Sequence, residues 1–491
     1  MTQPTIAPYG SWKSPITSDL IVARSVALLQ IALDGDGIYW IEQRPEEGGR
    51  NVIVRRTPDG QQQDVNRPPF NARTRVHEYG GGAFAVEGGT VYFSNFADQR
   101  LHRQDRGAAP QPLTPPIDLR YADGVIDRRR GRLIAVREDH TVAGREAVNT
   151  IASVDLEGDE LGGTVLVGGN DFYSTPSLNL DGMRLAWLTW NHPHMPWDGN
   201  ELWVAEFADD GSLRNATRVA GGGDESIFQP QWSPDGTLYF VSDRSGWWNL
   251  YRWRDGRSES LCEMAAEFGE PQWSFGRSTY AFESARYLLC TYRQRGVDRL
   301  ARLDTELLTL ETIDIPFSEI SSLHATANQA VFIGGSATEP ASVVRLDTAT
   351  RRWEVLRRAS DARVDAGYVS VPEPVEFPTE HGQTAFGFLY RPRNRDYVAP
   401  DGEKPPLLVK VHGGPTGATS PTLNLRIQYW TSRGFAVFDV NYGGSTGYGT
   451  AYRRRLNGQW GVVDVDDTVN GTRYLVERGE ADSRRLAIDG G

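Results

Sequence analysis

The sequence predicts a mixed fold, in which a seven-bladed β-propeller is followed by the first part of a parallel α/β domain. Two observations carry this prediction. Short apolar strands recur along residues 25–360 with a period of about 40–45 residues, which is typical of four-stranded blades arranged in a ring. From residue 361 onward, three apolar runs each end in a glycine-bearing turn, as strands do in a parallel sheet covered by helices.

The repeat is clearest where the Gln-Pro-Gln-Trp-Ser of residues 229–233 returns as Glu-Pro-Gln-Trp-Ser at 270–274. The fuller unit extends over residues 227–262. It contains an apolar strand, a Ser-Pro-Asp-Gly turn, two further strands at 238–242 and 249–253, and a weak fourth strand after an Asp-Gly turn. Alternating residues between Asp-Gly turns predict an antiparallel meander.

The second and third strands of this unit can be found seven times along the chain. The pairs are 38–41 with 51–54, 91–94 with 100–103, 133–136 with 150–155, 185–188 with 201–204, 238–242 with 249–253, 287–290 with 299–304, and 331–333 with 342–347. Seven four-stranded sheets indicate a propeller. The alternative is a pair of packed β-sandwiches, which the regular period disfavours.

Composition limits the classes of function. The 491 residues are 39% hydrophobic and 24% charged, and 52 basic against 64 acidic side chains give a net charge of −12, which disfavours nucleic-acid binding. The arginine clusters at 128–130 and 453–455 are therefore expected on solvated faces. Two cysteines, Cys262 and Cys290, are too few for a disulfide framework and favour a reducing cytoplasm.

Targeting, membrane and cofactor signals are not visible in the sequence. The first 15 residues are polar and broken by prolines, unlike a signal peptide. Apolar runs fall short of the ~20 residues that span a bilayer. The glycine runs at 80–82 and 221–223 do not have the context of a phosphate-binding loop, and no cysteine–histidine spacing suggests a metal. We expect a cytoplasmic protein without a cofactor, a membrane partner or a nucleic-acid partner.

Three turns follow the apolar runs of the C-terminal part. Residues 407–411 lead into His412, Gly413 and Gly414, residues 435–440 lead into Asn-Tyr-Gly-Gly-Ser, and residues 484–489 lead into Gly490 and Gly491. Parallel sheets carry their chemistry at the carboxyl ends of their strands. In hydrolases of this type the third turn is the nucleophile elbow, where glycines flank a serine. We therefore expect Gly490 and Gly491 to lead into that elbow.

With a propeller first and a parallel sheet after it, the chain resembles the prolyl oligopeptidase family of serine peptidases, and more narrowly its acylaminoacyl-peptidase and dipeptidyl-aminopeptidase-like members. The most specific motifs are NYGGSTGYG at 441–449, GQWG at 458–461 with Asp464 and Asp467, and RLAIDGG at 485–491. The segments 75–82 and 192–199 are also similar to those of the family. Gly443 departs from the arginine that is usual after the tyrosine.

The resemblance implies a serine peptidase that acts on short peptides through an acyl-enzyme, as an aminopeptidase or an acylaminoacyl-peptidase. In family members the last motif continues into Ser-x-Gly-Gly, and the triad follows in the order Ser, Asp, His. We therefore expect the triad beyond Gly491, an incomplete α/β-hydrolase domain over 361–491, and no activity from these 491 residues alone. The segment 1–24 is expected to pack on this domain. The alternative function is a non-catalytic propeller binding module with a vestigial hydrolase remnant.

Tyr442 is the candidate catalytic residue of this chain. We expect it to end the strand next to the nucleophile strand, so that its hydroxyl reaches the reacting carbonyl. The resemblance makes it an oxyanion-hole donor, and a buried packing tyrosine is the alternative. His412 is expected to bond neighbouring backbone rather than act as the base, while Gly413 and Gly414 let the chain bend tightly beside the site.

Four acidic residues are candidates for other roles. Aminopeptidases of this type must neutralise a free amine, for which a carboxylate is the simplest partner. Glu78 and Glu267 each precede the inner strand of a blade, where loops can face the hydrolase domain, although both could be exposed loop charges. Asp464 and Asp467 are expected on a helix, off the face shared by valines 465, 469 and 476, as capping or structural groups.

Overall fold

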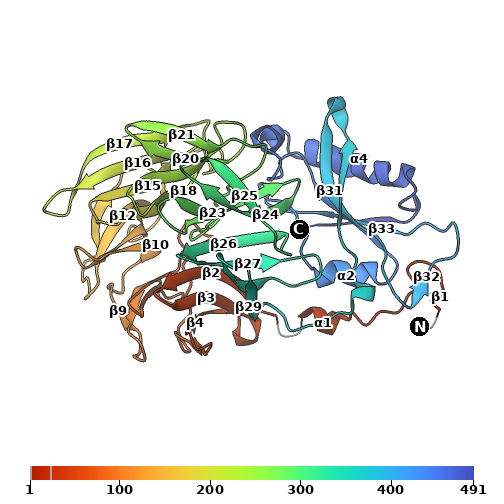
Figure 1. Ribbon diagram of the computed structural model, residues 1–491, viewed down its shortest axis with the longest axis horizontal. Coiled ribbons are helices and arrows are strands. Elements are labelled where there is room, and N and C mark those ends of the chain that lie inside the picture. Colours follow the sequence, from red (N-terminus) through yellow and green to blue (C-terminus); the bar gives the residue numbers. More distant parts are fainter. Residues whose placement is uncertain (1–2, 23–24, 491) are drawn as a thin grey trace.

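The computed structural model describes residues 3–22 and 25–490. Figure 1 shows a ring of β-sheets, coloured red to green along the chain, beside a smaller α/β part in blue. The described part of the chain contains seven four-stranded sheets, each made of four consecutive strands. The seven-bladed propeller followed by an α/β sheet is therefore confirmed, and the paired-sandwich alternative is wrong.

The first four blades contain strands β2 to β17. Blade 1 has β2 (Ala27–Asp34), β3 (Gly37–Arg44), β4 (Arg50–Arg56) and β5 (Gln62–Asp64), with the 3-10 helix η1 (Pro45–Glu47). Blade 2 has β6 (Phe84–Glu87), β7 (Thr90–Ser94), β8 (Leu101–Gln104) and β9 (Gln111–Pro112). Blade 3 has β10 (Leu119–Asp127), β11 (Arg132–Asp139), β12 (Val148–Asp155) and β13 (Thr164–Val167). Blade 4 has β14 (Phe172–Leu178), β15 (Arg184–Trp190), β16 (Glu201–Phe207) and β17 (Leu213–Gly221).

The last three blades contain strands β18 to β29. Blade 5 has β18 (Ile227–Trp232), β19 (Leu238–Ser242), β20 (Asn249–Arg254) and β21 (Arg257–Cys262). Blade 6 has β22 (Tyr280–Phe282), β23 (Tyr287–Gln294), β24 (Val297–Asp304) and β25 (Thr309–Ile313). Blade 7 has β26 (Glu319–Thr326), β27 (Gln329–Gly335), β28 (Ser342–Asp347) and β29 (Trp353–Arg358). The seven predicted strand pairs are the second and third strands of these blades.

The ring closes where blade 7 meets blade 1. Every blade is made of consecutive strands, so the two ends of the propeller are joined by a backbone bridge between Ser25 and Ser360 and by side-chain packing. Trp40 of blade 1 is fully buried in one apolar cluster with Val331 and Ile333 of blade 7. Burial of a large apolar side chain stabilises a fold by about 1.5–3 kcal/mol, so this cluster holds the two ends of the propeller together.

Two loops that lead into inner strands are joined within the ring. Gly81, before β6 of blade 2, forms a parallel bridge with Phe275, before β22 of blade 6, and the Phe275 N–H donates to the Gly80 carbonyl at 2.8 Å. The Asp123 N–H of blade 3 donates to the Gly82 carbonyl at 2.8 Å. Blades 2 and 6 are not neighbours in the ring, so this bridge, here called the axial tie, joins opposite sides of the propeller.

The α/β part is built on a five-stranded sheet with the order β30-β31-β34-β33-β35. Its strands are β30 (Glu373–Pro378), β31 (Thr384–Tyr390), β33 (Leu407–Val411), β34 (Ala436–Asn441) and β35 (Leu486–Gly490), and the last three are parallel. Helices α2 (Leu425–Thr431) and α4 (Val463–Glu477) lie on opposite faces (Figure 1), because Leu408 packs with Ile427 of α2 whereas Val409 packs with Leu475 of α4.

The remaining elements are short. They are α1 (Ser18–Val22), α3 (Thr450–Arg453), the strands β1 (Thr5–Ile6) and β32 (Tyr397–Val398), and the 3-10 helices η2 (Ala366–Tyr368), η3 (Glu380–Gly382) and η4 (Arg454–Leu456). β1 pairs in parallel with β32, and the Gly10 N–H donates to the Arg433 carbonyl at 3.1 Å, so the N-terminal segment lies against the α/β part. We propose a domain limit near residue 360, since β29 ends at Arg358. Across residues 3–22 and 25–490, none of the helices has the length and apolar character that crossing a membrane requires.

One expectation about the α/β part is wrong. β33 lies between β34 and β35, so the strand that ends before Tyr442 does not adjoin the strand that ends at Gly490. On α4, Asp464 and Asp467 lie off the face of the exposed Val465 and Val469, as expected, and both have structural roles. Asp464 accepts a hydrogen bond from the Gly461 N–H at 2.7 Å, and the buried Asp467 accepts hydrogen bonds from the Gly443 N–H at 2.7 Å and from a threonine hydroxyl.

Candidate active site

Three strand ends meet at one edge of the α/β sheet. Val411 at the end of β33 pairs with Val440 on one side and with Gly490 on the other. The turn with His412 and the turn with Tyr442 therefore begin at the level where β35 ends. Gly490 is placed at this edge, and Gly491 lies outside the described residues. Converging carboxyl ends of parallel strands are where such sheets place reacting groups.

Tyr442 lies across the end of β33. Its ring stacks on the His412 imidazole at a centroid distance of 4.5 Å, and its hydroxyl donates to the His412 carbonyl oxygen at 2.9 Å. The residue is 3% exposed. Burial, with a smaller contribution from the charge of Asp464, raises the pKa of Tyr442 to about 12. The hydroxyl is thus a protonated donor at neutral pH, as an oxyanion donor has to be.

His412 is held from both ring nitrogens. Nδ1 lies 3.0 Å from the Gly413 carbonyl oxygen, which can only accept, so Nδ1 carries the proton. Nε2 lies 2.8 Å from the Ser445 hydroxyl and accepts from it. Burial lowers the pKa of His412, which keeps the imidazole neutral. Ser445 is fully buried, so this serine–histidine contact positions the two turns relative to each other.

The turn after β33 is tied to the propeller. Gly414 has φ +126° and lets the chain reverse beside the sheet edge. Gly413 contributes the carbonyl that faces His412. Two residues after Gly414, the Thr416 carbonyl accepts a hydrogen bond from the Trp273 indole N–H at 2.5 Å. A loop of blade 6 thereby fixes the turn beside the candidate site.

A recess of about 660 Å³ lies on the propeller side of this contact. Trp273 lines it together with Tyr79, whose ring meets Trp273 at 5.1 Å, and with the stacked pair Phe172 and Trp190 at 5.5 Å. Its acidic lining residues are Glu78, Glu138, Glu146 and Asp171. The recess thus combines aromatic walls with carboxylates, a combination that accommodates an apolar group beside a cation.

The two tentative amine partners occupy different environments. Glu78 is exposed in the recess, with its backbone at φ +64°. Glu267 is 3% exposed, and its carboxylate accepts hydrogen bonds from the Trp248 N–H at 2.8 Å and the Gly449 N–H at 3.0 Å. Both oxygens of Glu267 already have backbone partners, so neither expected role, an amine partner or an exposed loop charge, fits this residue.

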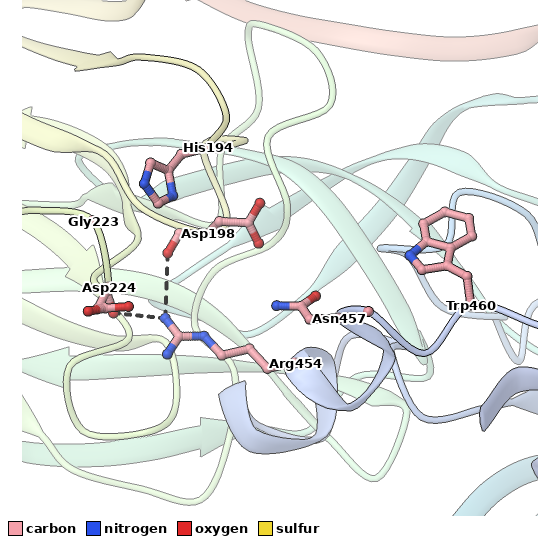
Figure 2. Close-up of a pocket in the computed structure, with 8 residues that line it drawn as sticks. His194, Asp198, Gly223, Asp224, Arg454, Asn457 and Trp460 are labelled. Atoms are coloured by element: carbon pink, nitrogen blue, oxygen red, sulfur yellow. Dashed lines mark hydrogen bonds between the residues drawn. The ribbon is translucent and has the colours of Figure 1, made fainter. Parts of the chain in front are cut away.

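A second pocket of about 410 Å³ opens between blade 4 and the segment after α3. Figure 2 shows Arg454 reaching across it to the propeller, where its guanidinium donates to the Asp224 carbonyl at 2.9 Å and contacts the Asp198 carbonyl at 3.5 Å. Its neighbour Arg453 is buried in a 2.6 Å ion pair with Asp243. The solvated face expected for residues 453–455 is therefore wrong for Arg453, because this cluster docks on the propeller.

Sequence reasoning missed the docking residues because their partners are far away in the chain. Asp243 and Arg453 are separated by 210 residues. The one local signal is the Trp-Trp pair at 247–248, since large aromatic side chains in a polar loop are typical of a buried contact. The Ser445 contact to His412 also had no sequence signal beyond the turn motif itself.

Comparison with known proteins gives consistent results. The family model described as the prolyl oligopeptidase family matches residues 421–491. The fold is similar to a solved puromycin-hydrolyzing peptidase of Mycobacterium tuberculosis, with 40% identity and a TM-score of 0.94 over 99% of this chain and 77% of that one. A mutant puromycin hydrolase complexed with PGG is 37% identical, with a TM-score of 0.93 and the same coverage.

A curated relative matches over a shorter length. Dipeptidyl aminopeptidase BIII of Pseudoxanthomonas mexicana is 34% identical over 125 residues, which are 25% of this chain and 18% of that protein. The match to dipeptidyl-peptidase 5 of Schizosaccharomyces pombe, at 22% identity, spans 38% of its length. The chain thus spans well under two thirds of the curated relatives that it matches.

Proposed function

Because this chain belongs to the prolyl oligopeptidase family of serine peptidases, we propose that the whole protein cleaves short peptides through an acyl-enzyme. The observation that carries the proposal is the protonated Tyr442 hydroxyl, held at the edge where β33, β34 and β35 end. In this proposal it donates to the oxyanion of the tetrahedral intermediate, and the second donor is the backbone N–H after the nucleophile. The nucleophile, acid and base are residues beyond Gly491.

The Tyr442 hydroxyl changes its acceptor during the proposed reaction. In the structure it donates to the His412 carbonyl. When a bound substrate is attacked, it donates to the oxyanion instead. Gly414, at φ +126°, supplies backbone freedom around this position, and the Trp273 contact to Thr416 keeps the turn in place. A neutral hydroxyl with a raised pKa stabilises the developing charge without losing its own proton.

We further propose that the recess beside Trp273 receives the N-terminal part of the substrate, with Glu78 as the partner of a free amino group. Its aromatic walls and exposed carboxylates support this role. Of the relatives described above, two are named for hydrolysis of puromycin, one of them complexed with PGG, and one is named an aminopeptidase, whereas other relatives are named acylamino-acid-releasing enzymes. The preference for unblocked peptides is therefore proposed from the exposed carboxylates of the recess. A cytoplasmic setting is proposed from the two free cysteines, Cys262 and Cys290.

The test is a kinetic comparison in the whole protein. Tyr442→Phe removes one oxyanion donor and is expected to lower kcat by about 10²–10³ with little change in KM. Tyr390→Phe is the matched control. Tyr390 lies on β31, away from the site, and it is also buried. Its hydroxyl also contacts a backbone carbonyl, that of Ser420, at 3.4 Å. A loss below tenfold for Tyr442→Phe would assign Tyr442 to packing. A whole protein that binds peptides without cleaving them would be a binding module instead.

A further inference from the structure

The propeller holds both ends of helix α3, the short helix that follows the Tyr442 turn. At its start, the Gly449 N–H donates to Glu267 at 3.0 Å, and the Thr450 N–H donates to the Gly246 carbonyl at 2.9 Å. The other oxygen of Glu267 accepts from the Trp248 N–H at 2.8 Å. Glu267 therefore joins the backbone of blade 5 to the backbone of the α/β part through one carboxylate.

At the end of α3, the guanidinium of Arg453 is buried against blade 5. It pairs with Asp243 at 2.6 Å, donates to the Trp197 carbonyl at 3.2 Å, and lies 4.1 Å above the Trp248 ring. The side chains of Arg453 and Asp243 are 3% and 1% exposed. A buried charge without its partner is strongly unfavourable, so this pair fixes where α3 docks.

Helix α3 is in turn bonded to the strand end that carries Tyr442. The Tyr452 hydroxyl donates to the Asn441 carbonyl at 2.7 Å, and the Tyr452 carbonyl accepts from the Gly444 N–H at 2.9 Å. Ser445 then bonds back to both sides of the site. Its N–H donates to the Tyr442 carbonyl at 2.9 Å, and its hydroxyl donates to His412 at 2.8 Å. The path from Glu267 to Tyr442 therefore consists of hydrogen bonds that are linked by short stretches of backbone, including helix α3 itself.

We propose that Asp243 and Glu267, although they belong to the propeller, are positioning residues for Tyr442, and that they act through Arg453 and helix α3. The inference rests on the proposed function, in which Tyr442 donates to the oxyanion. It assigns to the propeller a part in building the oxyanion hole. Loss of either carboxylate releases α3 from blade 5, and the Tyr442 hydroxyl then leaves the position that the oxyanion requires.

The test uses the whole enzyme, with Glu267→Gln and Asp243→Asn made alone and combined with Tyr442→Phe. Removal of the Tyr442 hydroxyl is expected to lower kcat by about 10²–10³. Because these substitutions misplace the hydroxyl without removing it, they are expected to lower kcat by about 10–100-fold and to change KM by less than about threefold. In the Tyr442→Phe background the same substitutions are expected to cost less than about threefold, because the donor on which they act is already absent.

The control is Asp127→Asn. Asp127 is also a buried carboxylate paired with arginine, at 3.0 Å from Arg132, but it lies in blade 3 away from α3. It is expected to leave kcat unchanged in both backgrounds. If a carboxylate variant does not fold, Thr450→Val replaces it, since it removes only the 3.2 Å hydrogen bond from the Thr450 hydroxyl to Asp243. A loss of about two- to fivefold in kcat is then expected, absent in the Tyr442→Phe background.

Two kinetic results would overturn the inference. One is a kcat within threefold of the wild type for Glu267→Gln and Asp243→Asn, and the other is an equal loss with and without the Tyr442 hydroxyl. Hydrogen exchange in the whole protein separates this inference from the proposed function, because it needs no activity. Glu267→Gln is expected to speed exchange of the Gly444 and Gly449 amides at least tenfold, and unchanged rates contradict the positioning path. If the amides respond while Tyr442→Phe is fully active, the oxyanion assignment is what fails.

Discussion

The axial tie of the propeller allows a test of whether the close approach of the Gly81 and Phe275 loops stabilises the fold. Gly81 has φ +87°, and a Cβ at this position would lie 2.3 Å from the Phe275 carbonyl oxygen and 2.8 Å from the Phe275 nitrogen. Both atoms are backbone, so relief of the clash requires the two loops to separate. Gly81→Ala is therefore expected to break the bridge between blades 2 and 6.

The expected loss of stability follows from three contributions. An L-residue at positive φ costs about 1–2 kcal/mol, overpacking costs about 1–3 kcal/mol, and a lost hydrogen bond costs about 1 kcal/mol. Together they predict a decrease in the free energy of unfolding of about 3–6 kcal/mol. The measurement is a urea titration followed by tryptophan fluorescence, for which the 14 tryptophans of the chain provide the signal.

A matched control isolates the contact from the backbone angle. Gly256 has φ +75°, and a Cβ there would meet nothing within 4 Å. Gly256→Ala is expected to cost only the conformational part, about 1–2 kcal/mol. The reasoning is refuted if the two variants lose the same free energy of unfolding within about 0.5 kcal/mol.

Tyr79 lines the recess two residues before Gly81, so Gly81→Ala is also expected to raise KM in the whole protein.

Two further predictions concern Glu78 and Asp123. Glu78→Gln in the whole protein is expected to raise KM about tenfold for peptides with a free amino group and to leave KM for N-acetylated peptides unchanged. The control Glu146→Gln, on the same recess, is expected to change KM for neither kind of peptide. Equal effects of Glu78→Gln on both kinds of peptide would contradict the assignment. Burial raises the pKa of Asp123 to about 6, so the folded protein binds a proton that the unfolded chain releases near pH 4. The contribution of Asp123 to the free energy of unfolding is therefore fully present below pH 4 and is lost as the pH rises through 6. The loss is at most about 3 kcal/mol. The difference in unfolding free energy between wild type and Asp123→Asn is expected to shift by that amount between pH 4 and 7, and a constant difference would refute it.

The propeller could be predicted because its signals are local. Within blade 5, Phe240 faces Tyr251 across two strands that alternate in the sequence, and Gly236 closes the turn before β19 by donating to the Ser233 carbonyl at 2.9 Å. Glycine turns recur at this place in blades 1 to 5, and short apolar strands recur in all seven blades, so the repeat alone indicates the architecture. The axial tie has no comparable signal, because Gly81 and Phe275 belong to loops nearly two hundred residues apart.

The candidate site could be predicted only in part, because some of its contacts join residues that are far apart in the sequence. Tyr442 and His412 follow apolar runs in recognisable turns, and the structure brings them into contact. Glu78 and Glu267 occupy equivalent places before inner strands, yet one is exposed in the recess and the other is buried between the domains. Glu267 differs from Glu78 in its backbone partners, the Trp248 amide and the Gly449 amide, of which the second is 182 residues away. The order of β33 and β34 in the sheet is likewise a long-range property that the individual strands do not encode.

The composition of the Tyr442 turn explains why an outside support is needed. Residues 443–449 contain four glycines, of which Gly444, Gly447 and Gly449 have positive φ. Glycine loses more conformational freedom on ordering than any other residue, so such a loop does not hold one shape on its own. The loop that leads into blade 6 supplies Glu267 to the Gly449 amide, and Arg293 of blade 6 lies against Gly447. The flexible segment beside the reacting centre is thus shaped by a rigid ring of sheets. In the proposed function, the propeller thus contributes geometry to the turn that carries Tyr442.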